Sequence, residues 1–162
     1  YKLYKNNPLG ELFLHYFPEW FIIFSPKLKI GAEYEASESN IANGLFIKGF
    51  SNGFWPHYQL GAFITEDEIK KGAFQETSYF LKVDCPEDFP KEELQFVPGG
   101  DYLCLLTKGK GQNLPFAVTS FLEKVEQSNL HTTGHIFIMD VVNNLITSNP
   151  NNYCTLIFAK KC

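Results

Sequence analysis

Short apolar runs dominate the chain, and most of them have the length of β-strands. Runs rich in Phe, Ile, Tyr and Val that are bounded by Pro, Gly or Asn predict strands. Such runs occupy residues 11–17, 19–25, 57–65, 76–84, 94–97, 101–109, 134–142 and 153–160. The pattern therefore predicts that β-sheet is the main element of this protein.

One segment has the clear period of an amphipathic helix. Its apolar positions are Val118, Phe121, Leu122 and Val125. Residues three and four apart are neighbours on a helix, so residues 114–129 present one apolar face. Pro115 suits the start of this helix, and Asn113 is a suitable N-cap. Weaker signals predict one helical turn that ends at Gly72 and a short or irregular helix within residues 31–53.

The order of these elements repeats. A strand, a helix and two strands occur in residues 19–84 and again in residues 94–162, within a single domain spanning 1–162. This order predicts an α+β fold in which two β-α-β-β halves form a mostly antiparallel sheet. We expect the helices on one face of the sheet and a ligand cleft on the other.

Composition and charge narrow the class of function. The net charge is −4, and every basic side chain is Lys, with no Arg. No basic stripe is present, so we expect no direct contact between this chain and nucleic acid. No apolar span reaches about 18 residues, so we expect no membrane segment. Aromatic residues make up 16% of the chain, which predicts either an aromatic-rich core or a cavity lined by rings.

Cysteines and histidines give no sign of a metal site. The spacing of Cys85, Cys104, Cys154 and Cys162 matches no zinc module. Buried reduced thiols are the expected state of Cys104 and Cys154, which favours a cytoplasmic location. His131 and His135 fall at the start of a strand, where residues four apart are about 13 Å from each other. The sequence predicts no metal and no cofactor, and none of the common nucleophile or metalloenzyme signatures is present.

Asp140 is the one acid within an otherwise apolar strand. By strand alternation it shares a face with Ile136 and Ile138, while Phe137 and Met139 lie on the other face. A buried carboxylate is costly unless it is paired or solvated. Two interpretations stay open: Asp140 caps the turn that follows the strand, or it faces a cleft and attracts a cation.

Four strings resemble the effector-binding domain of MerR-type transcriptional regulators, within the gyrase-inhibitor-like group of ligand-binding folds. They are NPLGELFLHYFPEWFIIF, YQLGAFITEDEI, VPGGDYLCLLTKG and LITSNPNNYCTLIF. Their order and spacing, rather than any one string, carry the resemblance. It spans the chain from Leu9 to about Lys160 and implies two strand–helix–strand–strand halves around a pocket for lipophilic, often cationic, compounds.

The resemblance also implies a set of ligand-binding residues, and this sequence departs from the family there. The position of the family's buried Glu is Ile138, and family ring positions fall on Leu60, Gly109 and Leu114. A strand Tyr of the family is kept as Tyr153, which either lines the pocket or packs in the core. The expected ligand-binding residues are therefore Asp140, Ile138, Tyr153, Tyr58, Leu60 and Leu114. Asp140 restores the charge two residues along the same face, and Tyr58 has the same relation to Leu60.

The implied function is a multidrug-type sensor module without enzymatic activity. It would bind a small apolar or cationic molecule inside a homodimeric cytoplasmic regulator, whose DNA-binding part lies N-terminal to this chain. The alternative is a stand-alone gyrase-inhibitor-like domain that hydrolyses small compounds or inhibits a protein partner.

Overall fold

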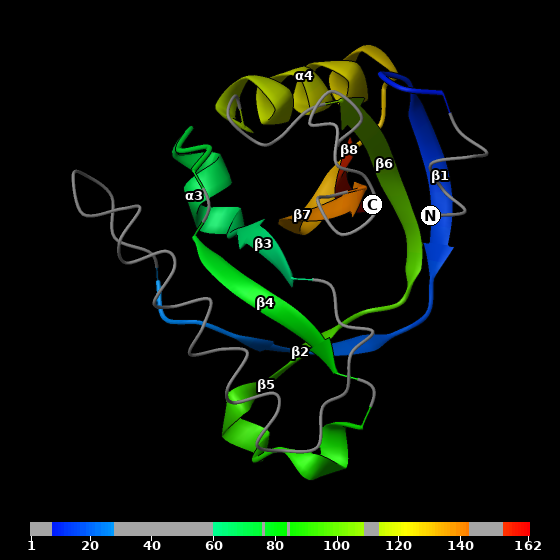
Figure 1. The fold of residues 1–162 in the computed structure, drawn as a ribbon. Coiled ribbons are helices and arrows are strands. Elements are labelled where there is room, and N and C mark those ends of the chain that lie inside the picture. The colour runs from blue at the N-terminus through cyan, green and yellow to red at the C-terminus, as the bar shows by residue number, and fades with distance from the viewer. Residues whose placement is uncertain (1–7, 28–59, 76, 84, 109–113, 143–153) are drawn as a thin grey trace.

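An eight-stranded antiparallel sheet forms the body of the protein, shown for the computed structural model in Figure 1. The structure describes residues 8–27, 60–75, 77–83, 85–108, 114–142 and 154–162. The strands are β1 (Leu12–Phe17), β2 (Trp20–Phe24), β3 (Leu60–Ile64), β4 (Ser78–Val83), β5 (Leu94–Val97), β6 (Gly100–Lys108), β7 (Thr132–Val142) and β8 (Cys154–Lys161). The described helices are α3 (Glu66–Lys70) and α4 (Leu114–Gln127), with 3-10 turns at Pro86–Asp88 and Lys91–Glu93. The predicted α+β class is confirmed.

The strand order gives the sheet an approximate internal symmetry. It is β1-β6-β8-β7-β3-β4-β2-β5, so β3 and β7 join the two halves at the centre. A strand at the start of each half pairs with the other half: β1, just before residues 19–84, pairs with β6, and β5, at the start of residues 94–162, pairs with β2. The chain passes from β1 to β2 through Pro18 and from β5 to β6 through Pro98, and these two corners lie together.

Gly99 allows the two corners to touch. A Cβ atom at this position would lie 2.6 Å from the backbone nitrogen of Glu19 and 3.0 Å from the carbonyl carbon of Pro18. Backbone atoms cannot rotate away as a flexible side chain could. We expect Gly99→Ala to lower the free energy of unfolding by about 1–3 kcal/mol, measured by urea denaturation. Gly72→Ala is a separate comparison. A Cβ atom at position 72 meets open space, so any loss of stability in that variant comes from the positive φ of the residue and not from a clash. An unchanged stability of Gly99→Ala would contradict the close crossing.

The sheet curves so strongly that strands far apart in its order meet across one face. Trp20 of β2 lies 5.2 Å from Phe137 of β7, measured between ring centroids, although β4 and β3 separate these strands. We call this concave side the aromatic face. Its buried residues are Trp20, Ile22, Phe63, Phe80, Val97, Tyr102, Cys104, Leu106, Phe137, Leu156 and Phe158. Much of the 16% aromatic content therefore serves packing.

The opposite side of the sheet packs against α4, as Figure 1 shows. We call it the helix face. Its buried residues are Ile64, Leu103, Leu105, Val118, Phe121, Val125, Ile136, Ile138, Ile157 and Ala159. The apolar positions predicted for α4 are confirmed, with Val118, Phe121 and Val125 buried and Leu122 packed partly buried against the cluster. Ile69 of α3 packs on the same cluster, so both described helices contact this side.

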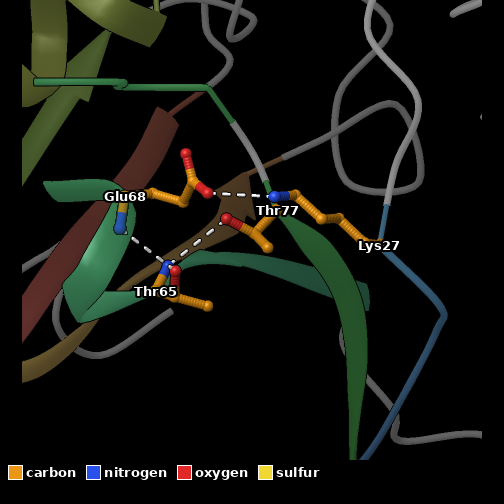
Figure 2. Close-up of polar contacts among 4 residues, drawn as sticks. All are labelled: Lys27, Thr65, Glu68 and Thr77. Atoms are coloured by element: carbon orange, nitrogen blue, oxygen red, sulfur yellow. Dashed lines mark hydrogen bonds and ion pairs between the residues drawn. The ribbon is translucent and has the colours of Figure 1, made fainter. Parts of the chain in front are cut away.

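Polar contacts fix the start of α3 (Figure 2). The Thr65 hydroxyl accepts a hydrogen bond from the Glu68 backbone N–H at 3.3 Å, as expected of an N-cap. Glu68 occupies the position from which a capping-box carboxylate would return to the backbone N–H of Thr65. Here the Thr77 hydroxyl accepts from that N–H, and Glu68 forms a 2.9 Å ion pair with Lys27. The ion pair lowers the pKa of Glu68 and links the segment after β2 to α3.

Candidate functional site

Strand β7 divides its side chains between the two faces as its alternation predicts. Phe137 packs on the aromatic face, with Met139 partly buried against it. Ile136 and Ile138 pack on the helix face. Asp140 follows Ile138 by two residues in the same strand. The residues expected to bind a ligand therefore have to be sought on the side of the sheet that carries α4.

Ile138 occupies the centre of this side. Its side chain is 5% exposed. In the sheet it pairs with Ala62 of β3 and with Ile157 of β8, which are both buried. Val118 and Phe121 of α4 belong to the same cluster. This placement differs from our expectation, because Ile138 lies on the helix side, whereas we expected the cleft on the opposite side.

The helix face becomes polar toward the end of β7. Asp140 pairs in register with Thr155 of β8, whose side chain is only 3% exposed. The Thr107 hydroxyl of β6 donates to the Thr155 carbonyl oxygen at 3.4 Å. The chain leaves β6 at Lys108 and enters α4 at Leu114, and such a short connection places the start of α4 near this end of the sheet. Thr107 and Thr155 form this polar end, and the sequence did not single them out.

The register brings part of the expected ligand set to this end. Leu60 begins β3 next to β7, Leu114 begins α4, and Asp140 lies in β7. The side chains of these three residues lie outside what the structure describes. Tyr58, Tyr153 and Gly109 lie outside the described residues altogether. Ile138 is the member of the set whose side chain is placed, and the roles of the others stay predictions.

Rings on the aromatic face pack on one another. Phe80 is fully buried, and the rings of Phe137 and Phe158 stack with centroids 5.3 Å apart. Tyr102 donates from its hydroxyl to the Pro98 carbonyl oxygen at 2.6 Å. An aromatic-lined cleft on this side stays a prediction, and the rings placed there form a core.

The two buried cysteines have thiols that stay protonated and unreactive at neutral pH. Burial raises the pKa of the Cys104 thiol to about 12, so almost no nucleophilic thiolate exists at neutral pH. Burial also raises the pKa of Cys154.

Among the described residues, no three His, Cys, Asp or Glu side chains gather into a metal-binding group. The same part of the chain contains no helix with the length and hydropathy of a membrane span.

His135 makes contacts that the sequence did not predict. Its ring stacks on Phe63 with centroids 5.1 Å apart and planes 15° apart. Its Nδ1 atom accepts from the Glu66 backbone N–H at 3.3 Å, and its Nε2 atom lies 3.1 Å from the Gln95 side-chain amide. Burial lowers the pKa of His135 more than the neighbouring carboxylates of Glu66 and Asp67 raise it.

Solved structures match the chain over nearly its whole length. No family model matches it, and no curated protein does. The EcmrR C-terminal domain is 13% identical, with a TM-score of 0.62 over 94% of this chain and 97% of that one. This chain therefore has the fold of the EcmrR C-terminal domain. In the EcmrR–DNA complex the match is also 13% identical, with a TM-score of 0.64, and covers 99% of this chain but 60% of that one.

Two further solved proteins share this fold. SAV2435 bound to tetraphenylphosphonium is 15% identical, with a TM-score of 0.57 and 94% of each chain covered. A hydrolase encoded by lin2189 from Listeria innocua is 11% identical, with a TM-score of 0.57, and 98% of this chain and 95% of that one are covered. At identities this low the matches establish the fold alone.

Proposed function

We propose that this chain is the small-molecule effector-binding module of a bacterial MerR-type transcriptional regulator. Its ligands are lipophilic molecules, including lipophilic cations. The observation that carries the proposal is the shared fold with the EcmrR C-terminal domain, together with the position of Ile138 at the centre of the helix face. The tetraphenylphosphonium bound to SAV2435 supports the ligand class.

A ligand that reaches the helix face has to be lipophilic on physical grounds, because the side chains there are apolar and packed against α4. The cluster around Ile138 consists of Ile, Leu, Val, Phe and Ala side chains. Each Å² of ligand apolar surface removed from water contributes about 25 cal/mol. Hydrophobic contact therefore supplies most of the binding free energy, and it does so for neutral and cationic ligands alike.

A cation needs an additional partner in such a surrounding. Burying an ionised group without one is costly. Asp140 is the acid of β7, and its register position beside Thr155 places its backbone at the polar end of the helix face. We propose that the Asp140 carboxylate takes the place of the family Glu, whose own position is Ile138.

Removing the charge of Asp140 tests its proposed role in binding cations. We expect Asp140→Asn to weaken tetraphenylphosphonium binding about fivefold to tenfold, because each tenfold in Kd corresponds to about 1.4 kcal/mol. Binding of triphenylphosphine oxide, which is neutral and of related shape, should change less than about twofold. Isothermal titration calorimetry measures both constants.

Asp101→Asn is the matched control, because Asp101 is an exposed strand acid on β6. It removes the same charge and should leave both ligands unaffected. Equal weakening of both ligands by Asp140→Asn would remove Asp140 from cation recognition. Absence of saturable binding by both ligands to the unmodified chain would contradict the proposed function itself.

In the regulator, ligand binding has to favour one conformation over another. A ligand shifts an equilibrium only through its differential affinity for the two states. We also propose that the chain works within a homodimeric cytoplasmic protein whose DNA-binding part lies outside this chain, and that this chain itself contacts no nucleic acid.

A hydrolase is the second candidate function, and the Listeria innocua structure is the observation that favours it. Hydrolysis requires an activated acid, base or nucleophile near the substrate. The absence of the family Glu at Ile138 and the raised pKa of Cys104 argue against this candidate. Turnover of a bound ester or amide, followed by chromatography, would favour the hydrolase over the sensor.

A further inference from the structure

His135 contacts three elements besides its own strand: the neighbouring strand β3, the start of α3 and the distant strand β5. It projects from β7, stacks on Phe63 of β3, and accepts from the Glu66 N–H at the start of α3. Its Nε2 atom meets Gln95 of β5. Strand β5 is an edge strand that pairs with β2, and three strands lie between β7 and β5 in the sheet order. The imidazole thus bridges the concave side of the sheet.

An irregularity in the pairing of β7 with β8 lies next to His135. The pairing of β7 with β8 shifts register between Thr133 and Phe137. Gly134 lies in this interval with a φ of 76°, a conformation that favours glycine. Bulges of this kind re-aim neighbouring side chains. The irregularity lies on the β8 side, while the pairing with β3 stays regular at Ile136 and Phe137, and His135 shares the aromatic face with Phe137.

The hydrogen bonds define the protonation state of the ring. Because Nδ1 accepts the Glu66 backbone N–H, it carries no proton. A neutral imidazole then carries its proton on Nε2. The Gln95 atom placed 3.1 Å from it is the amide nitrogen, so the amide has to be flipped for its oxygen to accept this proton. Protonation of Nδ1 would set two N–H donors against each other and break the bond to Glu66.

The charges that face the ring come from α3. Glu66 and Asp67 attract an imidazolium, whereas burial opposes it and has the larger effect. Gln95 on β5, Phe63 on β3 and Phe137 on β7 are the uncharged groups that pack around the ring.

We propose that His135 is a pH-sensitive latch. As a neutral imidazole it holds β5 and the start of α3 against β7, and uptake of a proton from solvent at Nδ1 releases the start of α3. The device does not depend on ligand binding, so it can succeed or fail separately from the proposed function.

The sign of the pH effect follows from the lowered pKa of His135. The unfolded chain binds a proton at a pKa of about 6.5, and the folded chain binds it at lower pH. The contribution of the neutral ring to stability is therefore full above about pH 6.5 and is lost as the pH falls through the folded pKa. Opening of the latch changes by at most about tenfold per pH unit, because one proton is involved.

NMR spectroscopy of the full chain tests the latch between pH 8 and pH 5. We expect ring nitrogen shifts at pH 7.5 that show an unprotonated Nδ1 and a protonated Nε2 on His135. Hydrogen exchange of the Glu66 amide, corrected for its intrinsic pH dependence, should accelerate with the same midpoint as the ring titration. Replacement of the exposed His131 by Gln should leave the pH dependence of Glu66 exchange unchanged.

His135→Gln removes the titration while keeping a polar side chain, and it should abolish the pH dependence of Glu66 exchange. If this variant fails to fold, the wild-type midpoints still decide. A ring that titrates without altering Glu66 exchange, or an Nδ1 that is protonated at pH 7.5, would overturn the proposal. Persistence of the pH dependence in a folded His135→Gln protein would overturn it as well.

Discussion

Replacing Ile138 with glutamate should lower the free energy of unfolding by about 3–5 kcal/mol at pH 7, because it buries a carboxylate without a partner. Ile138 is 5% exposed and surrounded by aliphatic side chains. The buried acid should have a raised pKa. The loss of stability should therefore shrink as the pH falls through that pKa, because the folded state then binds the additional proton. Urea denaturation at pH 5 and pH 7 measures this difference.

Ile138→Gln is the matched control, because a glutamine side chain has nearly the shape of glutamate and cannot ionise. It should cost less, about 1–3 kcal/mol for an unsatisfied polar group, and should show no added pH dependence. Tetraphenylphosphonium at 100 times its Kd for Ile138→Glu should return about 2.7 kcal/mol to that variant, and less at the same concentration to Ile138→Gln, which lacks the added charge. Wild-type stability for both variants would show that position 138 is not in an apolar surrounding.

Truncating Phe80 to alanine should have an effect of similar size, about 3–5 kcal/mol. The ring is fully buried at the centre of the aromatic face. Its centroid lies 5.6 Å from that of Trp20 and 5.7 Å from that of Phe137. Removing it leaves a cavity between the two halves of the sheet that the surrounding rings cannot fill. Urea denaturation checks the stability, and Phe96→Ala, at a ring that is 50% exposed, should cost less than about 1 kcal/mol.

Gly61 provides an independent check on the placement of Phe80. A Cβ atom on Gly61 would lie 2.3 Å from Cζ of Phe80, so Gly61→Ala should cost about 1–3 kcal/mol. Much of that cost should vanish in the Phe80→Ala background, because the overlapping ring is gone. Additive effects in this double-mutant cycle would contradict the contact.

The spacing of apolar residues along the chain predicted those elements whose buried side repeats at a regular interval. The helix at α4 and the alternation of Phe137 and Ile138 were predictable, because apolar spacing of 3.6 and of 2 reports which side is buried. The turn at α3 was predictable from the acids before Gly72. The structure of residues 31–53 lies outside the described residues, so the helix expected there stays a prediction.

Contacts between distant strands could not be predicted in the same way. The corners at Pro18 and Pro98 indicate where strands end, but not that β1 and β5 pair with opposite halves. The strong curvature depends on rings such as Trp20 and Phe137, which meet across intervening strands. For the same reason the sequence did not connect His135 to Gln95, nor Thr155 to Asp140.

Isoleucine methyl NMR tests the central claim most directly, namely that lipophilic molecules bind on the helix face beside Ile138. Ile138 and Ile157 lie on that face, and Ile22 on the aromatic face is the internal control. Titration with tetraphenylphosphonium or triphenylphosphine oxide should shift the Ile138 and Ile157 signals saturably and leave Ile22 in place. Saturable shifts confined to Ile22, or no saturable shift at any of the three, would contradict the account.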